Sequence, residues 1–180
     1  TIHDLIINEF PTGRASTLPL PIYYMKWLSY KFILRNAVIK SKKIIVPSNS
    51  VKEEISSKLK IKQEKICVTH EGVFDLDSKV VMPKTKPKNL PKQYFLKVGN
   101  VYPHKNTTRL LAAFEKFHAI SPHVALVFAG KNDYFMERLR LEVGKKKIKN
   151  YIVFIDNPTD EKLLTLYSFA SATIVPSLKE

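Results

Sequence analysis

The sequence contains one cysteine, few glycines and no long apolar run. Cys67 is the single cysteine among 180 residues, so an internal disulfide is excluded, and its apolar neighbours Ile66 and Val68 predict a buried thiol in a reducing compartment. No spacing of histidines and cysteines resembles a zinc site. The longest apolar runs, such as 124–129, are too short to cross a bilayer, and residues 1–4 show neither the basic start nor the apolar run of a secretory signal. These absences argue against the disulfide-rich, zinc-binding and membrane-spanning classes of protein.

Acidic residues are scarce beside the basic ones. The chain has 30 lysines and arginines but 16 aspartates and glutamates, which gives a formal net charge of +14. Lysines gather in segments 84–92 and 145–149. A basic surface can bind nucleic acid, an anionic membrane or a phosphorylated substrate, and a merely solvated lysine-rich surface is the plain alternative. The aromatic residues Phe114, Phe117 and Tyr167 follow the spacing of a core and are not interleaved with lysines, which disfavours a nucleic-acid-binding module.

Apolar runs and amphipathic stretches alternate along the second half of the chain. Thr159 is suited to cap a helix, because Asp160 and Glu161 follow it in the first turn, where the helix dipole favours carboxylates. The strand-helix alternation predicts an α/β fold, with a parallel sheet and helices on both of its faces. We expect strands at 94–98, 124–129, 151–155 and 172–175, and helices at 107–120, 134–145 and 159–170.

The first half follows the same order less regularly. A capping box at 50–53 predicts the start of its second helix. Segment 83–92 combines three prolines with several lysines and has no apolar periodicity, so it is interpreted as a linker between two α/β units. A long surface loop inside one domain is the alternative. The expected elements are the end of a strand at 1–7, a helix at 22–39, a strand at 43–46, a helix ending near 59 and a strand at 66–69.

The turn that opens at Gly99 has the composition of an anion site. Gly99 lets a ligand approach the backbone, the next helix begins with N–H groups that lack intrahelical partners, and Lys105 adds a full positive charge. Polar turns also follow the other strands, at 130–132, 156–159 and 176–180, and the carboxyl ends of parallel strands share one edge of a sheet. The glycine spacing of a P-loop or dinucleotide fingerprint is absent. The turn therefore predicts a phosphate site, and an ordinary helix start with a surface lysine is the alternative.

The chain resembles a known family of enzymes. It is similar to the carboxyl-terminal domain of retaining glycosyltransferases of group 1, family GT4, in three ordered stretches: YFLKVGNVYPHKNTTRLLAAFEKF, HVALVFAGK and VFIDNPTDEKLLTLYSFASATIVPSLKE. It is similar to the later part of that family's amino-terminal domain in TIHDL, KKIIVPSNSVKEEI and KICVTHEGV.

The resemblance implies the GT-B fold, in which two Rossmann-like parallel-sheet units face each other. Both units would be incomplete here, so we interpret the chain as an internal fragment or a partial gene product of a longer enzyme. Residues 1–82 would be the later part of the amino-terminal, acceptor-side domain. Residues 83–92 would be the linker rich in proline and lysine, and 93–180 the first part of the nucleotide-sugar-binding domain.

The resemblance also implies how the donor would be held. Lys105 matches the lysine that contacts the donor diphosphate, with Gly99 and His104 beside it. Asn100 stands where the family often has an arginine, so the grip on the donor must rest more on Lys105, helped by His104. A lysine here would neutralise the charge that grows on the departing diphosphate.

Other residues are assigned by the same resemblance. Glu180 matches the first glutamate of the family's paired motif and would contact the donor sugar, while His3 would reach the transferred sugar. These two are the candidate catalytic residues, and a structural hydrogen bond is the alternative for His3. Asp156, Asn157 and Pro158 occupy the place of the loop near the nucleobase.

The implied activity is the transfer of a sugar from a nucleotide-sugar donor to a saccharide or lipid-linked acceptor, with retention. The segments HD and PHKN are most similar to mannosyltransferases, so GDP-mannose is the first choice of donor, and no metal is expected. We expect a cytoplasmic protein, with peripheral contact at the inner membrane face as an option, and no transferase activity from this chain by itself. The alternatives are a GT-B-fold nucleotide-sugar epimerase, against which the Pro-Ser-x-x-Glu spacing argues, and a basic nucleic-acid-binding module.

Overall fold

A computed structural model describes residues 1–9, 16–72, 83 and 85–179. Contacts within the chain form two compact units, Thr1–Leu76 and Asp77–Lys179. The boundaries expected from the sequence, with a linker at 83–92, remain predictions. Within that segment, Leu90 is buried and packs with Tyr94 and Leu96.

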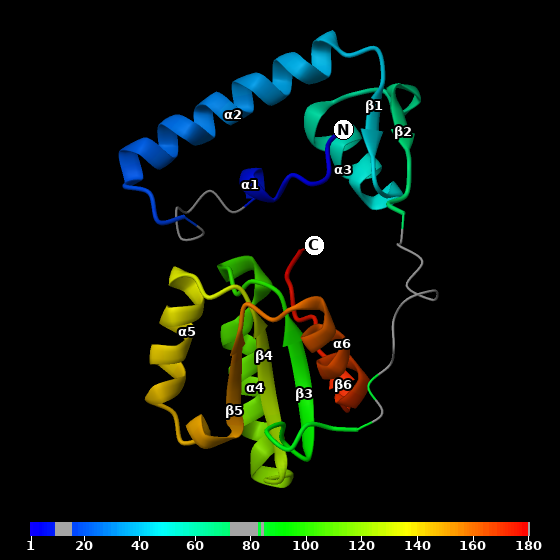
Figure 1. Cartoon of the computed structure of the whole chain (residues 1–180). Coiled ribbons are helices and arrows are strands. Elements are labelled where there is room, and N and C mark those ends of the chain that lie inside the picture. Colours follow the sequence, from blue (N-terminus) through cyan, green and yellow to red (C-terminus); the bar gives the residue numbers. More distant parts are fainter. Residues whose placement is uncertain (10–15, 73–82, 84, 180) are drawn as a thin grey trace. The chain divides into compact units, whose positions relative to one another are not determined.

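The second unit is built on a four-stranded parallel sheet (Figure 1). Its strands lie in the order β5-β4-β3-β6, so β3 and β4 are central. Parallel neighbours need a crossover, and each crossover here contains one helix. The strands are β3 (Gln93–Val98), β4 (Val124–Gly130), β5 (Ile152–Asp156) and β6 (Ala172–Thr173), and the helices are α4 (Thr107–Ile120), α5 (Tyr134–Gly144) and α6 (Asp160–Phe169).

Both faces of this sheet are covered. Leu126 and Phe128 of β4 belong to a core cluster with residues of α4 and α5. Ala125 and Val127 alternate with them along the strand and belong to a second cluster with Leu166 of α6. Every residue of β4 is buried, as expected for a central strand with helices on both sides. The predicted α/β fold with a parallel sheet and helices on both faces is therefore confirmed.

The first unit contains a two-stranded parallel sheet and three α-helices in its described part. Its core consists of apolar residues from both strands, from the long helix α2 and from α3, including Leu34, Val38, Val46 and Ile55. The described helices include none that is both long and apolar enough to span a membrane. The elements are α1 (Ile6–Glu9), α2 (Leu20–Lys40), β1 (Ile44–Val46), α3 (Asn49–Leu59) and β2 (Ile66–Val68), and the 3₁₀ turns of the chain are η1 (Gln63–Lys65), η2 (Pro103–Lys105) and η3 (Lys149–Tyr151).

Side chains cap the starts of α3 and α6, and one of these caps differs from the expected residue. Thr159 caps α6 as expected, because its Oγ1 accepts a hydrogen bond from the backbone N of Lys162. The capping box expected at 50–53 is wrong. Ser48 is the N-cap of α3, and its Oγ accepts from the backbone N of Val51 at 3.2 Å.

Three further expectations differ from the structure. Residues 1–5 form no strand: α1 begins at Ile6 instead, and a single backbone hydrogen bond joins the N of Ile2 to the O of Ile45. Strand β6 ends at Thr173, two residues earlier than expected. Cys67 is exposed, because it and its register partner Ile45 lie on the outer face of a sheet too small to be covered on both sides.

Candidate functional site

The carboxyl ends of β3 and β4 approach each other closely. Gly99 has a φ of 98°, a left-handed conformation that favours glycine, and its N donates to the backbone O of Ala129 at 2.9 Å. A Cβ added to Gly130 would lie 2.5 Å from the O of Gly99, so only glycine fits there. The two turns that follow these strands are thus fixed against each other.

The turn after β3 continues into η2 and then into α4. His104 is buried in η2, and its backbone O accepts from the N of Leu178 at 2.8 Å. Asn106 has a φ of 55°, and its Nδ2 donates to the O of Pro176 at 3.1 Å. Asn106 stands at the N-cap of α4, but its side chain makes no capping hydrogen bond and binds Pro176 instead. The segments PHKN and PSLK, far apart in the sequence, therefore lie side by side.

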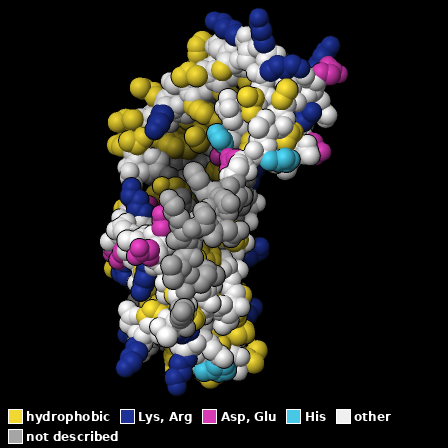
Figure 2. All heavy atoms as spheres, turned by 45° about the vertical axis from the view of Figure 1, so that its right-hand side comes forward, with side chains coloured by type: hydrophobic (Ala, Val, Ile, Leu, Met, Phe, Trp, Pro, Cys, Tyr) yellow, Lys and Arg dark blue, Asp and Glu magenta, His cyan; other side chains and the backbone are white. Residues whose placement is uncertain are grey.

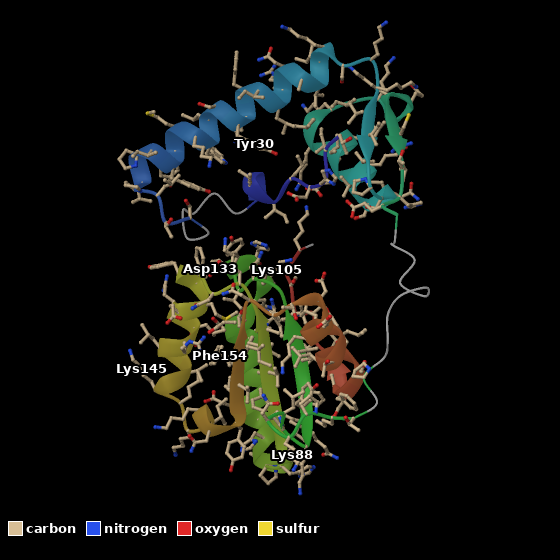
Figure 3. The ribbon with its side chains drawn as sticks, in the orientation of Figure 1. Tyr30, Lys88, Lys105, Asp133, Lys145 and Phe154 are labelled. Atoms are coloured by element: carbon tan, nitrogen blue, oxygen red, sulfur yellow. The ribbon has the colours of Figure 1, made fainter. Side chains whose placement is uncertain are left out.

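The start of α4 adds polar groups to this edge. Thr107, the first residue of α4, is 7% exposed, and its Oγ1 has no hydrogen-bond partner among the described residues. The Oδ1 of Asn100 is likewise buried without such a partner in the described part of the chain. Lys105 lies half-buried at this end of the unit, on the same side as Asp133 (Figure 3). The Oδ1 of Asn100 can only accept a hydrogen bond, but the Thr107 hydroxyl can donate one, and together with the unpaired N–H groups of the helix start it suits an anionic ligand.

A second cation lies at the same strand end, and sequence reasoning missed it. Lys97 of β3 is 4% exposed, and its Nζ donates to the backbone O of Asn100. A Cβ on Gly99 would lie 3.9 Å from that Nζ. The sequence does carry a signal for it, which is a lysine inside an apolar strand. A buried lysine is rare unless it meets an acceptor or a counter-charge, so such a position indicates a specific role.

The turns after β4 and β5 are also tied together. Asn157 has a φ of 45°, its N donates to the O of Gly130 at 2.8 Å, and its Oδ1 accepts from the N of Asn132 at 3.2 Å. Pro158 follows and is half-buried. Hydrogen bonds thus connect all four turns of the sheet's carboxyl edge, from 130–132 and 156–159 to the Gly99 turn and the segment after β6.

Asp156 is engaged in an ion pair. One terminal nitrogen of Arg140 lies 2.8 Å from Oδ1 and 2.9 Å from Oδ2 of Asp156. The Arg140 guanidinium also lies over the ring of Phe154, 4.4 Å from its centroid. The Asp156 carboxylate therefore fixes α5 to the end of β5, and a ligand would have to share it with Arg140.

The two candidate catalytic residues are placed differently. His3 lies in the first unit, where its exposed Nδ1 is 3.0 Å from Oε1 of Glu71. Glu180 lies outside the described residues. Among the residues that are described, no group of three histidines, cysteines or carboxylates is arranged to hold a metal ion.

Comparison with known proteins identifies the family. The model of the family described as "Glycosyl transferases group 1" matches residues 80–180, more than half of the chain, so the chain belongs to this family. The matched region contains every element of the second unit's sheet and all four turns described above.

The chain is also similar to an individual protein of that kind. It is 29% identical over 181 residues to the O-antigen chain mannosyltransferase RfbU of Salmonella typhimurium. The alignment covers 96% of this chain and 48% of the relative, so the chain spans about half the length of the curated relative that it matches.

Proposed function

We propose that this chain is part of a retaining glycosyltransferase of the GT-B type that transfers mannose from GDP-mannose. The observation that carries the proposal is the edge where the turn of Lys105 meets the segment at 176–178. Membership of the group 1 family supports the reaction class, and similarity to a protein named as a mannosyltransferase supports the sugar. In this proposal the first unit belongs to the acceptor-side domain and the second to the donor-side domain.

The donor diphosphate would lie at the start of α4. Lys105 would supply a positive charge to it, and the unpartnered Oγ1 of Thr107 and the helix N–H groups would donate hydrogen bonds. The arginine that the resemblance implies is replaced by Asn100, and the Nζ of Lys97 lies beside that residue's carbonyl. Lys97 is therefore our candidate for the second cation.

The chemical step needs charge stabilisation on the leaving group. As the bond to the sugar breaks, negative charge grows on the diphosphate, and cations fixed nearby lower the barrier because they need no reorganisation. We assign to Glu180 the contact with the hydroxyls of the donor sugar, and to His3 a contact with the transferred sugar. We assign the nucleobase to the turn of Asn157 and Pro158, where Asp156 acts chiefly through Arg140. The acceptor would be a saccharide or lipid-linked saccharide.

Binding of GDP tests the proposal directly. Lys105→Ala should weaken GDP binding by about tenfold to a hundredfold, because it removes a charge-assisted contact of roughly 1.5–3 kcal/mol. Lys88→Ala is the matched control, since Lys88 is exposed at the opposite end of the same unit (Figure 3). Calorimetric titration of both folded variants gives the comparison. Unchanged GDP affinity in Lys105→Ala would overturn the diphosphate site.

A further inference from the structure

His3 and Glu71 come from distant parts of the sequence and meet within the first unit. Nδ1 of His3 lies 3.0 Å from Oε1 of Glu71, and 68 positions separate the two residues in the chain. Their side chains are 65% and 69% exposed, so the contact lies at the surface and not in the core. Figure 2 shows histidine and acidic side chains exposed beside one another in the upper part of the view. The pair is therefore open to a ligand.

Backbone hydrogen bonds to β1 bring the two residues together. The N of Ile2 donates to a carbonyl of β1, so the segment that carries His3 lies beside this strand. The N of Thr69 donates to the O of Val46 and continues the pairing of β1 with β2 toward the turn of Glu71. Strand β1 thus aligns both segments.

The turn that carries Glu71 is also held by its neighbour. Nδ1 of His70 lies 3.1 Å from the O of Pro47, the residue that follows β1. Because a carbonyl oxygen only accepts hydrogen bonds, Nδ1 of His70 is the donor. His70 therefore ties the turn after β2 to the turn after β1, and Glu71 is the side chain of this turn that reaches His3.

Asp4 is the acid next to His3 in the sequence, but it has a different role. Its Oδ1 accepts a hydrogen bond from the backbone N of Ile6 at 2.9 Å, where α1 begins. The two residues of the HD segment are therefore used separately. Asp4 supports the start of a helix, and the imidazole of His3 pairs with Glu71.

The contact fixes which nitrogen of His3 carries the proton. An ionised carboxylate only accepts hydrogen bonds, so Nδ1 of the neutral imidazole donates to Glu71 and Nε2 keeps its lone pair. Within the part of the chain that the structure describes, the imidazole makes no other hydrogen bond. Nε2 can therefore accept a hydrogen bond from a hydroxyl group.

We propose that Glu71 is a positioning residue that presents Nε2 of His3 to a hydroxyl of the transferred sugar. This inference rests on the proposed function, which assigns His3 to that sugar. The sugar hydroxyl donates to Nε2 and Nδ1 keeps its proton, so no proton is transferred. The carboxylate orients the ring, and its negative charge makes Nε2 a stronger acceptor.

The charge of Glu71 should matter most during the reaction. Positive charge grows on the sugar as the diphosphate departs, and a ring polarised by a carboxylate favours this state over the bound donor. Glu71 should therefore affect turnover more than donor affinity. A merely structural pair of this exposure would affect neither of them.

The tautomer of His3 can be measured in the 180-residue chain. Nitrogen-15 NMR at alkaline pH, where imidazoles are neutral, should show the proton of His3 on Nδ1. In Glu71→Gln the signal should move toward the tautomer mixture of a solvated histidine, and His3→Ala assigns that signal. His70 is the internal reference, because its contact with Pro47 should keep its proton on Nδ1 in both proteins.

Kinetics of the complete transferase proposed above test the role of the pair. Glu71→Gln should lower kcat about fivefold and leave KM for the donor nearly unchanged. The melting temperature should not change, because both side chains are exposed. Glu64→Gln is the matched control: it removes the same charge from an exposed position of the same unit, in η1, and should leave kcat and the His3 tautomer unchanged.

A double-mutant cycle shows whether Glu71 acts through His3. In a His3→Ala background, Glu71→Gln should have no further effect on kcat, because the ring that Glu71 orients is gone. The same fivefold loss in both backgrounds overturns the inference, as does a proton on Nε2 of His3 in the unmodified chain. If His3→Ala lowers kcat and Glu71→Gln does not, the inference fails and the proposed function stands. A normal kcat in His3→Ala refutes the assignment of His3 to the sugar, and the inference with it.

Discussion

The side-chain amide of Asn106 donates to the backbone O of Pro176 over 3.1 Å and joins two segments that lie 70 residues apart. Asn106 holds this position with a φ of 55°, a conformation that asparagine tolerates better than most residues. The same residue therefore provides both a hydrogen bond and a left-handed turn between η2 and α4.

These two contributions can be separated by mutation. Asn106→Gly keeps the backbone conformation and loses the hydrogen bond, so it should lower the free energy of unfolding by about 1 kcal/mol. Asn106→Ala should cost about 1–2 kcal/mol more, because alanine is strained at this φ. Urea denaturation of both variants measures the difference. Equal stability of the two would contradict the proposed strain of alanine at this φ.

Lys97 should matter more for the ligand than for the fold. Lys97→Met keeps the volume of the side chain but leaves the backbone O of Asn100 without its donor, so the free energy of unfolding should fall by about 1 kcal/mol. GDP affinity should fall about tenfold or more if Lys97 is the second cation at the diphosphate. Thermal melts paired with calorimetric titration check both. A lower melting temperature with unchanged GDP affinity would show that Lys97 only secures the turn.

The ion pair between Arg140 and Asp156 should be structural and weak. Both side chains are about one-third exposed, so a double-mutant cycle with Arg140→Ala and Asp156→Ala should give a coupling energy of about 0.5–1 kcal/mol. We expect Arg140→Ala to lower stability more than Asp156→Ala, because Arg140 also lies over the ring of Phe154 and 3.5 Å from Glu137. A coupling near zero, together with a loss of GDP binding in Asp156→Ala alone, would instead favour direct contact with the nucleobase.

Ionisation of Tyr94 should lower the stability of the second unit at alkaline pH. Its hydroxyl donates to the O of Leu166 at 2.8 Å, and burial raises its pKa above 10.0. Tyr94→Phe should cost about 1 kcal/mol near neutral pH. Because the folded pKa lies above the unfolded one, the contribution of the hydroxyl is complete below about pH 10.0 and is lost as the pH rises through the folded pKa. Chemical denaturation on both sides of that pH should show the two proteins converging, and a constant difference would contradict the assignment.

The sequence was informative where apolar periodicity was strong. It predicted α4 and α5 to within a residue, because their apolar faces repeat regularly and Thr107 follows a polar turn. It was wrong about Cys67, since apolar neighbours do not reveal that a two-stranded sheet leaves one face open. The cap of α5 was missed, although Asp133 stands directly before the helix and accepts from two backbone N–H groups.

The site was harder to predict than the fold. Composition and strand order were enough to expect polar turns at one edge of the sheet. The contacts that join them depend on left-handed conformations at Asn106 and Asn157, which no periodicity indicates. The buried Nζ of Lys97 and the pairing of Asp156 with Arg140 arise from side-chain packing between elements, and a single sequence does not reveal such pairings.

The burial of strand β4 should determine how its amide hydrogens exchange with solvent. All seven of its residues are buried, and β3 and β5 pair with its two edges. Its amide hydrogens therefore cannot reach solvent through local fraying, and they should exchange only when the whole second unit unfolds. Their exchange rates would report the global stability of that unit separately from the first, whose core cluster contains no residue of β4.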